Sequence, residues 1–362
     1  MNAPGLEEVA DLLSDAVTAR VTPGAVLHTG TSLGPRWTLA AGHLTYAADA
    51  ELVTPATVYD LASLTKVLAT TALAMRHACT GALPLDTIVA DRLPQCSAQP
   101  RITVADLLEH AAGLPAHRPF YREVAGRAGY LARIAAEPFV YTPRATHAYT
   151  DLGFMLLGLL IEDAGGAPLP VQFDRVVRDA LGPAEIAYGM RDGWRARVAP
   201  TSVSPWRERM LVGEVYDDNA AALGGAAGHA GLFGTAAAVG AFARWFLALW
   251  QGRVIVSAGI TTAQARRFAA RGTVARSSRA LGWDTMLPSS SCGPRLSPRA
   301  IGHTGYTGTS LWIDPDRDLY VVLLTNRVHP GSGGDGGADG IKALRVAVHD
   351  ALADAHATGR SD

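Results

Sequence analysis

Lysine is almost missing from this sequence. Only two of its 32 basic residues are lysines, and all the others are arginines. An arginine guanidinium stays protonated at any ordinary pH, whereas a desolvated lysine ammonium can lose its proton and act as a base. Where a positive charge is sufficient, this chain uses arginine. The presence of Lys66 therefore indicates a role that arginine cannot fill.

Cysteine is scarce, net charge is close to zero, and long apolar stretches are absent. The three cysteines cannot form a disulfide framework without a leftover thiol, which is typical of a reducing compartment. Basic and acidic residues number 32 and 33, with no long run of one sign, which argues against a nucleic-acid partner or an anionic membrane. The longest apolar stretch, 154–161, is too short to span a bilayer. Residues 1–16 lack the features of a signal peptide, so we expect a cytoplasmic protein.

The sequence has ample material for a large core. Of its 362 residues, 48% are hydrophobic and 18% are charged, which suits one big domain or two interlocked ones. The two ends of the chain are predicted to share a sheet, because residues 310–313 and 320–325 resemble strands around the turn 314–318. Further elements are expected near the ends: a helix at 5–20, strands at 25–29 and 36–41, and an amphipathic helix at 341–355.

Between these ends lies a mostly helical stretch. Helix-like segments at 104–109 and 152–163 are separated by loops that contain proline. We predict an α/β (α+β) fold in which residues 1–76 and 221–362 form a sheet subdomain and residues 77–220 an inserted helical subdomain. We expect the active-site cleft between these two subdomains, because clefts occur preferentially at such junctions. The glycine-rich stretch 331–337 has no phosphate-loop context, so it is interpreted as a linker.

Ser63 precedes Lys66 by three positions. Residues with this spacing share one helix face, so Lys66 can reach the Ser63 hydroxyl and raise its nucleophilicity. At the first turn of a helix, the N–H of Ser63 and the positive end of the dipole would favour an oxyanion. The spacing also arises often by chance. Further motifs along the chain are therefore needed to support a catalytic role for Ser63 and Lys66.

Tyr149-Thr150-Asp151 is a second candidate catalytic motif. The segment opens an apolar helix at 152–160, from which a phenol can point into a cleft. A tyrosine near cations can hold a depressed pKa and relay protons. Taken alone, Tyr149 is more often a core residue with a wet hydroxyl. Asp151 can orient a substrate or simply cap the helix.

His303-Thr304-Gly305-Tyr306 enters the predicted C-terminal hairpin. Gly305 permits close approach of a substrate to the strand edge, and the N–H of Tyr306 is the obvious second oxyanion donor. None of the eleven histidines has a metal-ligand spacing, so we expect no metal and no cofactor. Residues 217–219 and 224–231 are interpreted mainly as structural loops.

In this order, Ser63-Leu64-Thr65-Lys66, Tyr149-Thr150-Asp151 and His303-Thr304-Gly305 resemble the three motifs of class C beta-lactamases and penicillin-binding-protein-like serine hydrolases. Flanking segments at 102–115 and 228–236 are also similar, and the likeness spans about residues 23–327. The resemblance implies a beta-lactamase/transpeptidase-like fold: an antiparallel sheet flanked by helices, plus an inserted all-helical subdomain.

The resemblance also implies roles for these residues. Ser63 would attack an acyl carbonyl, Lys66 would accept its proton, and Tyr149 would relay a proton to the leaving group. The N–H groups of Ser63 and Tyr306 would hold the oxyanion. Substrate contacts would come from the other motif residues: Asp151, His303, Thr304 and Gly305.

Two departures from the family pattern affect the expected substrate. His303 stands where true beta-lactamases and transpeptidases usually carry lysine, and Asp151 stands where asparagine is usual. A neutral histidine lacks the permanent charge that suits a substrate carboxylate, and an ionised Asp151 would repel an anion. Esterase-like branches of the family often share the histidine form. We therefore expect weak or no beta-lactam hydrolysis.

Four functions stay open at this point. The leading one is a serine hydrolase that forms an acyl-enzyme with a small ester or amide. A transacylase would pass the acyl group to an amine or alcohol, which would be a second substrate. A D-amino-acid peptidase is possible on family grounds. A silent binding module is disfavoured because Ser63, Lys66 and Tyr149 are all present. The oligomeric state is not readable from the sequence.

Overall fold

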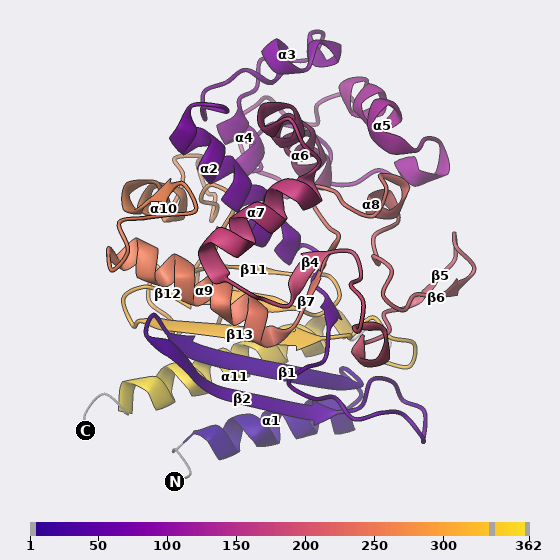
Figure 1. Cartoon of the computed structure of the whole chain (residues 1–362), viewed down its shortest axis with the longest axis vertical. Helices are drawn as coiled ribbons and strands as arrows, with labels where there is room; N and C mark the ends of the chain where they lie inside the picture. Colours follow the sequence, from indigo (N-terminus) through magenta and orange to yellow (C-terminus); the bar gives the residue numbers. More distant parts are fainter. Residues whose placement is uncertain (1–4, 333–336, 359–362) are drawn as a thin grey trace.

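A six-stranded antiparallel sheet forms the base of the molecule (Figure 1). The computed structural model describes residues 5–332 and 337–358, so most of the stretch interpreted as a linker lies outside the described residues. The strand order is β10-β11-β12-β13-β1-β2. The strands are β1 (Gly24–Thr31), β2 (Gly34–Gly42), β10 (Asp284–Thr285), β11 (Ile301–Thr304), β12 (Ser310–Asp314) and β13 (Leu319–Thr325). Because β1 pairs with both β2 and β13, the two ends of the chain share one sheet, as predicted.

Helices cover both faces of this sheet (Figure 1). Helices α1 (Leu6–Thr18) and α11 (Gly337–Thr358) lie on one face, and α9 (Ala236–Gln251) lies on the other. All eight residues of β1 are buried because the strand is central and covered on both sides. On the edge strand β2, by contrast, no residue is fully buried, and half-buried and exposed positions alternate in part. The predicted antiparallel sheet flanked by helices is confirmed.

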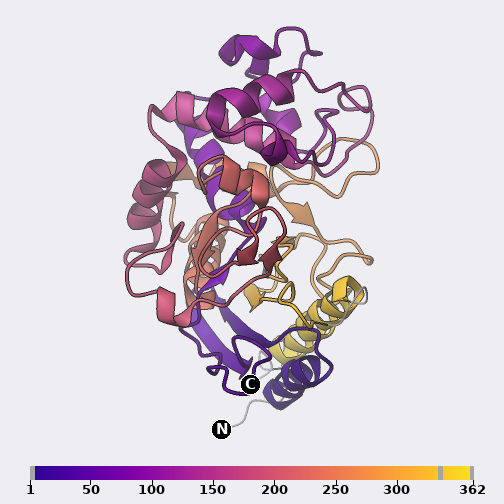
Figure 2. The same cartoon turned by 90° about the vertical axis from the view of Figure 1, so that its right-hand side faces the viewer.

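A layer of helices stands above the sheet (Figures 1 and 2). Its larger members are α2 (Ala72–Thr80), α5 (Gly126–Ala135), α6 (Asp151–Gly165) and α7 (Leu169–Leu181). Shorter helices are α3 (Val89–Arg92), α4 (Val104–Leu108), α8 (Asp218–Ala222) and α10 (Thr262–Ala269). Residues 152–161 of α6 are buried inside the protein. Within the described residues no single helix could cross a membrane, although the bent pair α6 and α7 jointly has the length and composition to do so.

The stretch 77–220 is not purely helical. It contains β4 (Ile186–Tyr188) and the hairpin strands β5 (Val203–Ser204) and β6 (Arg209–Met210). Strand β4 joins a small sheet with β7 (Leu232–Gly234) and β3 (Tyr59–Asp60). These strands have only two or three residues each, too few to show an alternating pattern in the sequence. A further small hairpin, β8 (Val256–Ser257) and β9 (Ile260–Thr261), precedes α10.

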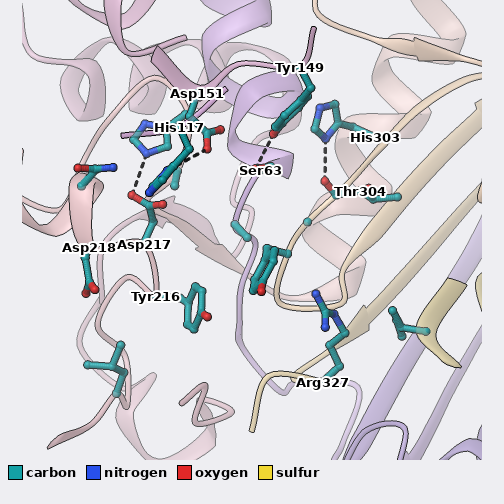
Figure 3. A pocket seen from close by; sticks show the side chains of 18 of the residues that line it. Ser63, His117, Tyr149, Asp151, Tyr216, Asp217, Asp218, His303, Thr304 and Arg327 are labelled. Carbon is teal, nitrogen blue, oxygen red and sulfur yellow. Dashed lines mark hydrogen bonds and ion pairs between the residues drawn. The ribbon is translucent and has the colours of Figure 1, made fainter. Parts of the chain in front are cut away.

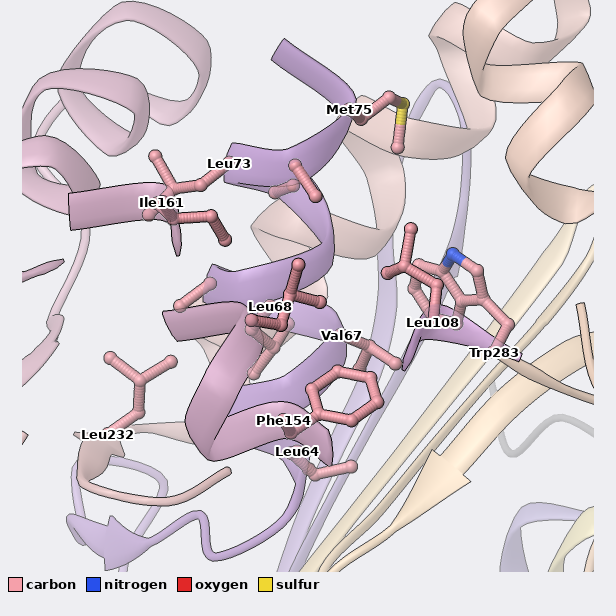
Figure 4. Close-up of a cluster of buried hydrophobic side chains, with 14 of the residues drawn as sticks. Leu64, Val67, Leu68, Leu73, Met75, Leu108, Phe154, Ile161, Leu232 and Trp283 are labelled. Carbon is pink, nitrogen blue, oxygen red and sulfur yellow. The ribbon is translucent and has the colours of Figure 1, made fainter. Parts of the chain in front are cut away.

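The helix that follows Ser63 is the centre of the main hydrophobic core (Figure 4). Its first part, Lys66–Thr71, is a π-helical segment in which every residue is buried, and it continues into α2. Leu64, Val67 and Leu68 pack there with Phe154 of α6. Segments of π-helix occur frequently at functional sites. The core therefore fixes the helix that carries Lys66 on all sides.

Candidate active site

Ser63 lies at the turn between the short strand β3 and the buried helix. The turn is tight: the N–H of Leu64 donates to the carbonyl of Leu61, and that of Lys66 donates to the carbonyl of Ser63, at 3.0 and 3.1 Å. Ala62, directly before the serine, has a φ of 47°, in the left-handed region that alanine rarely adopts. We had expected Ser63 in the first helical turn, and it lies just ahead of it. A strained turn presents the side chain to a cleft.

The first two motifs meet at the Ser63 hydroxyl (Figure 3). Lys66 Nζ lies 2.9 Å from Ser63 Oγ, and the hydroxyl of Tyr149 donates to the same Oγ at 2.9 Å. Tyr149 comes from the loop that ends at α6, so the two groups approach from different elements. A nucleophile with two proton-transfer groups in hydrogen-bond reach is the geometry that acyl transfer needs. The residues predicted from the sequence to cooperate are brought together.

The electrostatics of Lys66 differ from the sequence-based expectation. The side chain is fully buried, and burial alone would lower the pKa of its ammonium. Asp151 Oδ1 lies 2.8 Å from Nζ, and the negative charge and hydrogen bond of this carboxylate raise the pKa of Lys66 above the usual lysine value. Lys66 is therefore an ammonium ion in the resting protein. We had expected burial to lower the pKa of Lys66, but the negative charge of Asp151 raises it instead.

Asp151 is an ion-pair partner, not a helix cap. Thr150 caps α6 by accepting from the N–H of Gly153, while Asp151 points to Lys66. The second oxygen of Asp151 lies 4.0 Å from Nδ1 of the half-exposed His117. Of the two roles considered from the sequence, the cap is wrong. Contact with a substrate stays a prediction for this side chain, which is 18% exposed.

Tyr149 is a neutral phenol in the resting protein. Burial raises its pKa, and the nearby charge of Lys66 offsets only part of that rise. The depressed pKa expected from neighbouring cations is therefore wrong, because desolvation prevails. The loop that carries Tyr149 rests on His110, whose ring lies 4.7 Å from the tyrosine ring. Nδ1 of His110 accepts from the N–H of Thr150 at 3.1 Å.

The third motif forms the opposite wall of the cleft. His303 lies on β11, and its Nδ1 donates to the carbonyl of Thr304 at 2.8 Å. Burial, together with the charges of Lys66 and Arg279, lowers the pKa of His303 well below the usual value, so the ring is neutral. Its Nε2 is buried without a hydrogen-bond partner among the described residues. A neutral histidine agrees with the sequence argument.

Two backbone N–H groups are available for an oxyanion. Neither the N–H of Ser63 nor that of Tyr306 has a hydrogen-bond acceptor among the described residues. Gly305, just before Tyr306, is fixed because its N–H donates to the carbonyl of Thr309 at 2.7 Å. A Cβ on Gly305 would lie 2.1 Å from the Thr309 hydroxyl and 2.8 Å from the carbonyl oxygen of Leu61. Glycine here allows β11 to approach the Ser63 turn closely.

A cleft of about 860 Å³ opens above Ser63. In Figure 3, Asp151, His117 and the acidic pair Asp217 and Asp218 lie on one side, and the residues around His303 lie on the other. Tyr216 stacks on Tyr306 at 5.6 Å between ring centroids, with 21° between the planes. The hairpin β5–β6 borders the cleft through residues 203–205. A volume of this size suits a small organic substrate.

Several residues of the site were missed in the sequence. Two of them are arginines of the cleft, Arg279 and Arg327, whose guanidinium groups have no hydrogen-bond or ion-pair partner among the described residues. Arg327 packs on the ring of Tyr306, with 4.7 Å from its Cζ to the ring centroid. It lies two residues after the predicted strand 320–325, and a charged residue just beyond the end of a central strand was a signal that could have found it.

The loops interpreted as structural also reach the site. Nε2 of His229 lies 2.9 Å from Asp217 Oδ1, and the carbonyl of His229 accepts from Lys66 at 3.2 Å. Burial opposes the charge on Asp217, but His229 and the N–H of Ala220 hold the pKa of that carboxyl well below its usual range. Nothing in their local sequence separates these residues from ordinary loop residues. Only the fold brings them to Lys66.

Comparisons with known proteins agree with this architecture. A family model described as Beta-lactamase matches residues 9–345. The "Putative D-alanyl-D-alanine carboxypeptidase" of Escherichia coli (strain K12) is 28% identical over 310 residues, which cover 76% of this chain and 70% of that protein. A LovD6 mutant of simvastatin synthase from Aspergillus terreus has a TM-score of 0.75 at 20% identity, covering 99% of this chain and 96% of the other. EstCE1, described as a hydrolase with promiscuous acyltransferase activity, has a TM-score of 0.73 at 21% identity, covering 96% and 98%.

Proposed function

The chain belongs to the beta-lactamase family of serine hydrolases, and we propose that it forms an acyl-enzyme on Ser63 with a small ester or amide. One observation carries the proposal: Ser63 Oγ lies 2.9 Å from both Lys66 Nζ and the Tyr149 hydroxyl, beside two unengaged backbone N–H groups. Nucleophile, proton carriers and oxyanion donors are thus in one place. Esterase activity is the trait we expect to be easiest to measure.

The proposed reaction begins when the Lys66–Tyr149 pair has lost one proton. Ser63 Oγ then attacks the acyl carbonyl, and its proton passes to that pair. The carbonyl oxygen becomes an oxyanion facing the N–H groups of Ser63 and Tyr306. The bond to the leaving alcohol or amine breaks, and Tyr149 returns the proton to the leaving atom. Water releases the acyl group from Ser63 by the same steps in reverse.

The acyl-enzyme is tested by the mass of the intact protein. Wild type and Ser63→Ala are incubated with activated esters, a penicillin and a thioester. We expect an adduct or turnover with at least one ester in the wild type and none in the variant, with little reaction of the penicillin. Equal reaction of both proteins would place the acylated atom elsewhere. Neither an adduct nor turnover with any donor would contradict the proposal.

Transfer to a second substrate is the alternative fate of the same intermediate. Two proteins of the same fold are described as a synthase and as a hydrolase with promiscuous acyltransferase activity, which supports this alternative. Addition of amines or alcohols to the acylated protein distinguishes the two fates. A faster loss of the adduct, with formation of the new amide or ester, would indicate transfer. An unchanged rate would indicate hydrolysis.

A peptidase that acts on a free carboxyl terminus is the second candidate function. The observation that favours it is the pair of unpartnered guanidinium groups of Arg279 and Arg327 in the cleft, which suit a carboxylate. Relatives described as carboxypeptidases point the same way. The test compares a peptide that ends in a D-residue with the same peptide amidated at its C terminus. Preference for the free acid would support the peptidase, and equal rates would oppose it.

A further inference from the structure

Asp60 is a buried carboxylate directly below the Ser63 turn. It lies at the end of β3, is 1% exposed, and does not line the cleft. Both of its carboxylate oxygens accept backbone N–H groups. Oδ1 accepts from Ala62 at 2.8 Å, and Oδ2 accepts from Tyr216 at 2.6 Å. The carboxylate therefore bridges two segments that are far apart in the sequence.

The first bridged segment is the turn of the nucleophile. Ala62 has a left-handed backbone, and such strain persists only where the surroundings fix it. Asp60, two residues before Ala62, accepts a hydrogen bond from the N–H of Ala62. The N–H of Ser63, which would serve the oxyanion, follows immediately. The orientation of that N–H depends on the turn, and the turn depends on the hydrogen bond to Asp60.

The second bridged segment holds groups on both sides of Ser63. The ring of Tyr216 stacks on Tyr306, the residue whose N–H is the other oxyanion donor. Asp217 follows Tyr216 and binds His229, whose carbonyl accepts from Lys66. One carboxylate thus positions a segment that contacts the oxyanion side and the lysine side of the site.

The backbone beside Asp60 adds a third connection. The carbonyl of Asp60 accepts from the Thr307 hydroxyl at 2.9 Å, and that of Leu61 accepts from the Thr309 hydroxyl at 3.1 Å. Both threonines belong to the loop that follows β11 and contains Tyr306. The end of β3 therefore joins the two backbone segments that carry the proposed oxyanion donors.

We propose that Asp60 is a positioning residue for acyl transfer, and that its ionised carboxylate sets the relative geometry of the Ser63 and Tyr306 N–H groups. The inference rests on the proposed acyl-enzyme. Asp60 acts through the backbone groups that it binds and touches no substrate. Both oxygens are needed as acceptors, because each faces an N–H donor. A carboxylate meets that requirement, whereas an amide or a protonated carboxyl presents a donor to one of the two N–H groups.

The charge state of Asp60 gives this role a pH signature. Burial raises the pKa of Asp60 to about 6, and the charge of Asp217 adds to the rise. The N–H groups of Tyr216 and Ala62 and the charge of Arg207 oppose it. The carboxyl is ionised above this pH and protonated below it. Protonation would remove one of the two bridging hydrogen bonds.

Asp60→Asn tests the inference by imitating the protonated state permanently. We expect the rate of Ser63 acylation by a neutral activated ester at pH 8 to fall about ten- to hundredfold, with KM nearly unchanged. Binding of an arylboronic acid, which forms a tetrahedral anion on the serine, should weaken by a similar factor. In the wild type, acylation should show a step near pH 6 that the variant lacks.

Asp314→Asn is the matched control. Asp314 is also 1% exposed and accepts the N–H of Ser297 at 2.7 Å and that of Asp316 at 3.1 Å, but it is the last residue of β12 and lies outside the cleft. We expect its folded fraction to acylate at the wild-type rate. Thr307→Val, which removes the hydroxyl that reaches the Asp60 carbonyl, keeps the test available if Asp60→Asn does not fold. It should lower acylation and boronic acid binding together, by a smaller factor.

The outcomes separate this inference from the proposed function. Wild-type acylation with an unchanged rate and pH profile in Asp60→Asn would overturn the positioning role alone. Loss of activity only in proportion to loss of folded protein, equal in Asp60→Asn and Asp314→Asn, would also overturn it. A wild type that never acylates would overturn the proposed function, and this inference with it. A selective fall in acylation and boronic acid affinity would establish it.

Discussion

The two walls of the cleft treat charge in opposite ways. On the wall with α6 and the loop after β6, every carboxylate has a partner inside the protein: Asp151 binds Lys66, Asp217 binds His229 and Asp218 binds Arg207. On the wall with β11, by contrast, Arg279 and Arg327 have no acceptor among the described residues, and Nε2 of His303 has no donor. The charged groups of the first wall are paired within the protein, whereas the second wall has polar groups that a ligand could pair with.

This difference separates the two tasks of the site. Charges that are neutralised within the protein cannot attract a substrate, so the Asp151 wall controls the protons of Lys66 and Tyr149. Unpartnered donors and acceptors gain the most from a ligand, because a buried polar group without a partner is costly. The His303 wall is therefore where we expect substrate selection. Substitutions on the first wall should change turnover or its pH dependence, and those on the second should change substrate preference.

Lys66→Arg should have the largest effect on the first wall. The charge beside Asp151 is kept, but a guanidinium cannot give up its proton and is larger than the fully buried site allows. We expect turnover of a neutral ester to fall by about three to four orders of magnitude. The comparison variant is Lys342→Arg, at the other lysine, which is exposed on α11 at the border of the same cleft and has no hydrogen bond to Ser63, Tyr149 or Asp151, so we expect it to behave as wild type. Normal turnover by Lys66→Arg in a folded protein would refute its role as a base.

Tyr149→Phe should have a similar or smaller effect on the same wall. It removes the hydroxyl that donates to Ser63 Oγ and leaves the ring packed on His110. We expect turnover to fall by about two to four orders of magnitude, measured by steady-state hydrolysis of an activated ester. Donors with a good leaving group should lose less, because they need less help from a proton. A small, uniform loss would move the relay to another group.

Arg327→Gln should change the second wall selectively. If the unpartnered guanidinium binds a carboxylate, kcat/KM for a substrate with a free carboxylate should fall about ten- to hundredfold, as a hydrogen bond to a charged group contributes about 1.5–3 kcal/mol. The neutral amide of the same compound should be hardly affected. Arg127→Gln on α5, whose arginine is paired with Glu162, is the control for loss of an arginine outside the cleft. Equal losses on acid and amide would remove Arg327 from substrate selection.

Asp151→Asn should have the smallest effect on rate and a clear effect on pH dependence. The Asp151 charge raises the pKa of Lys66, and without it the effect of burial, which lowers that pKa, prevails. The reactive, deprotonated form should then appear at lower pH. We expect the acidic limb of the kcat/KM profile to move to lower pH relative to wild type. A limb that stays in place would show that Lys66 does not determine it.

Much of this architecture could be predicted from the sequence, and the reasons are local. Strong turn chemistry around residues 314–318 and the periodic pattern of 341–355 predicted β12, β13 and α11, because both patterns are independent of distant contacts. The spacing of Ser63 and Lys66 likewise depends on one short segment. The cytoplasmic location and the boundaries at residues 76 and 220 stay predictions.

What could not be predicted depends on contacts between distant segments. The pKa values of Lys66 and Tyr149 are set by Asp151 and by burial, which a motif does not contain. The raised lysine pKa in particular requires the 2.8 Å distance to a residue 85 positions away. Asp60 gave no signal at all, because its role follows from the N–H of Tyr216, which the fold brings to it. Motifs identify reacting groups, whereas the surroundings that tune them come from tertiary structure.

The pairing of β1 with β13 has a consequence for how the protein reaches its active form. Ala25 lies opposite Thr325, so the centre of the sheet joins segments that are separated by almost the whole chain. Contacts of such high sequence separation make folding slow. During synthesis, β1 has to wait for β13 to leave the ribosome, and the loop that carries Tyr306 is fixed at the same late stage. Ser63 is therefore synthesised long before the segments that complete its site, and the site forms only after β13 has paired with β1.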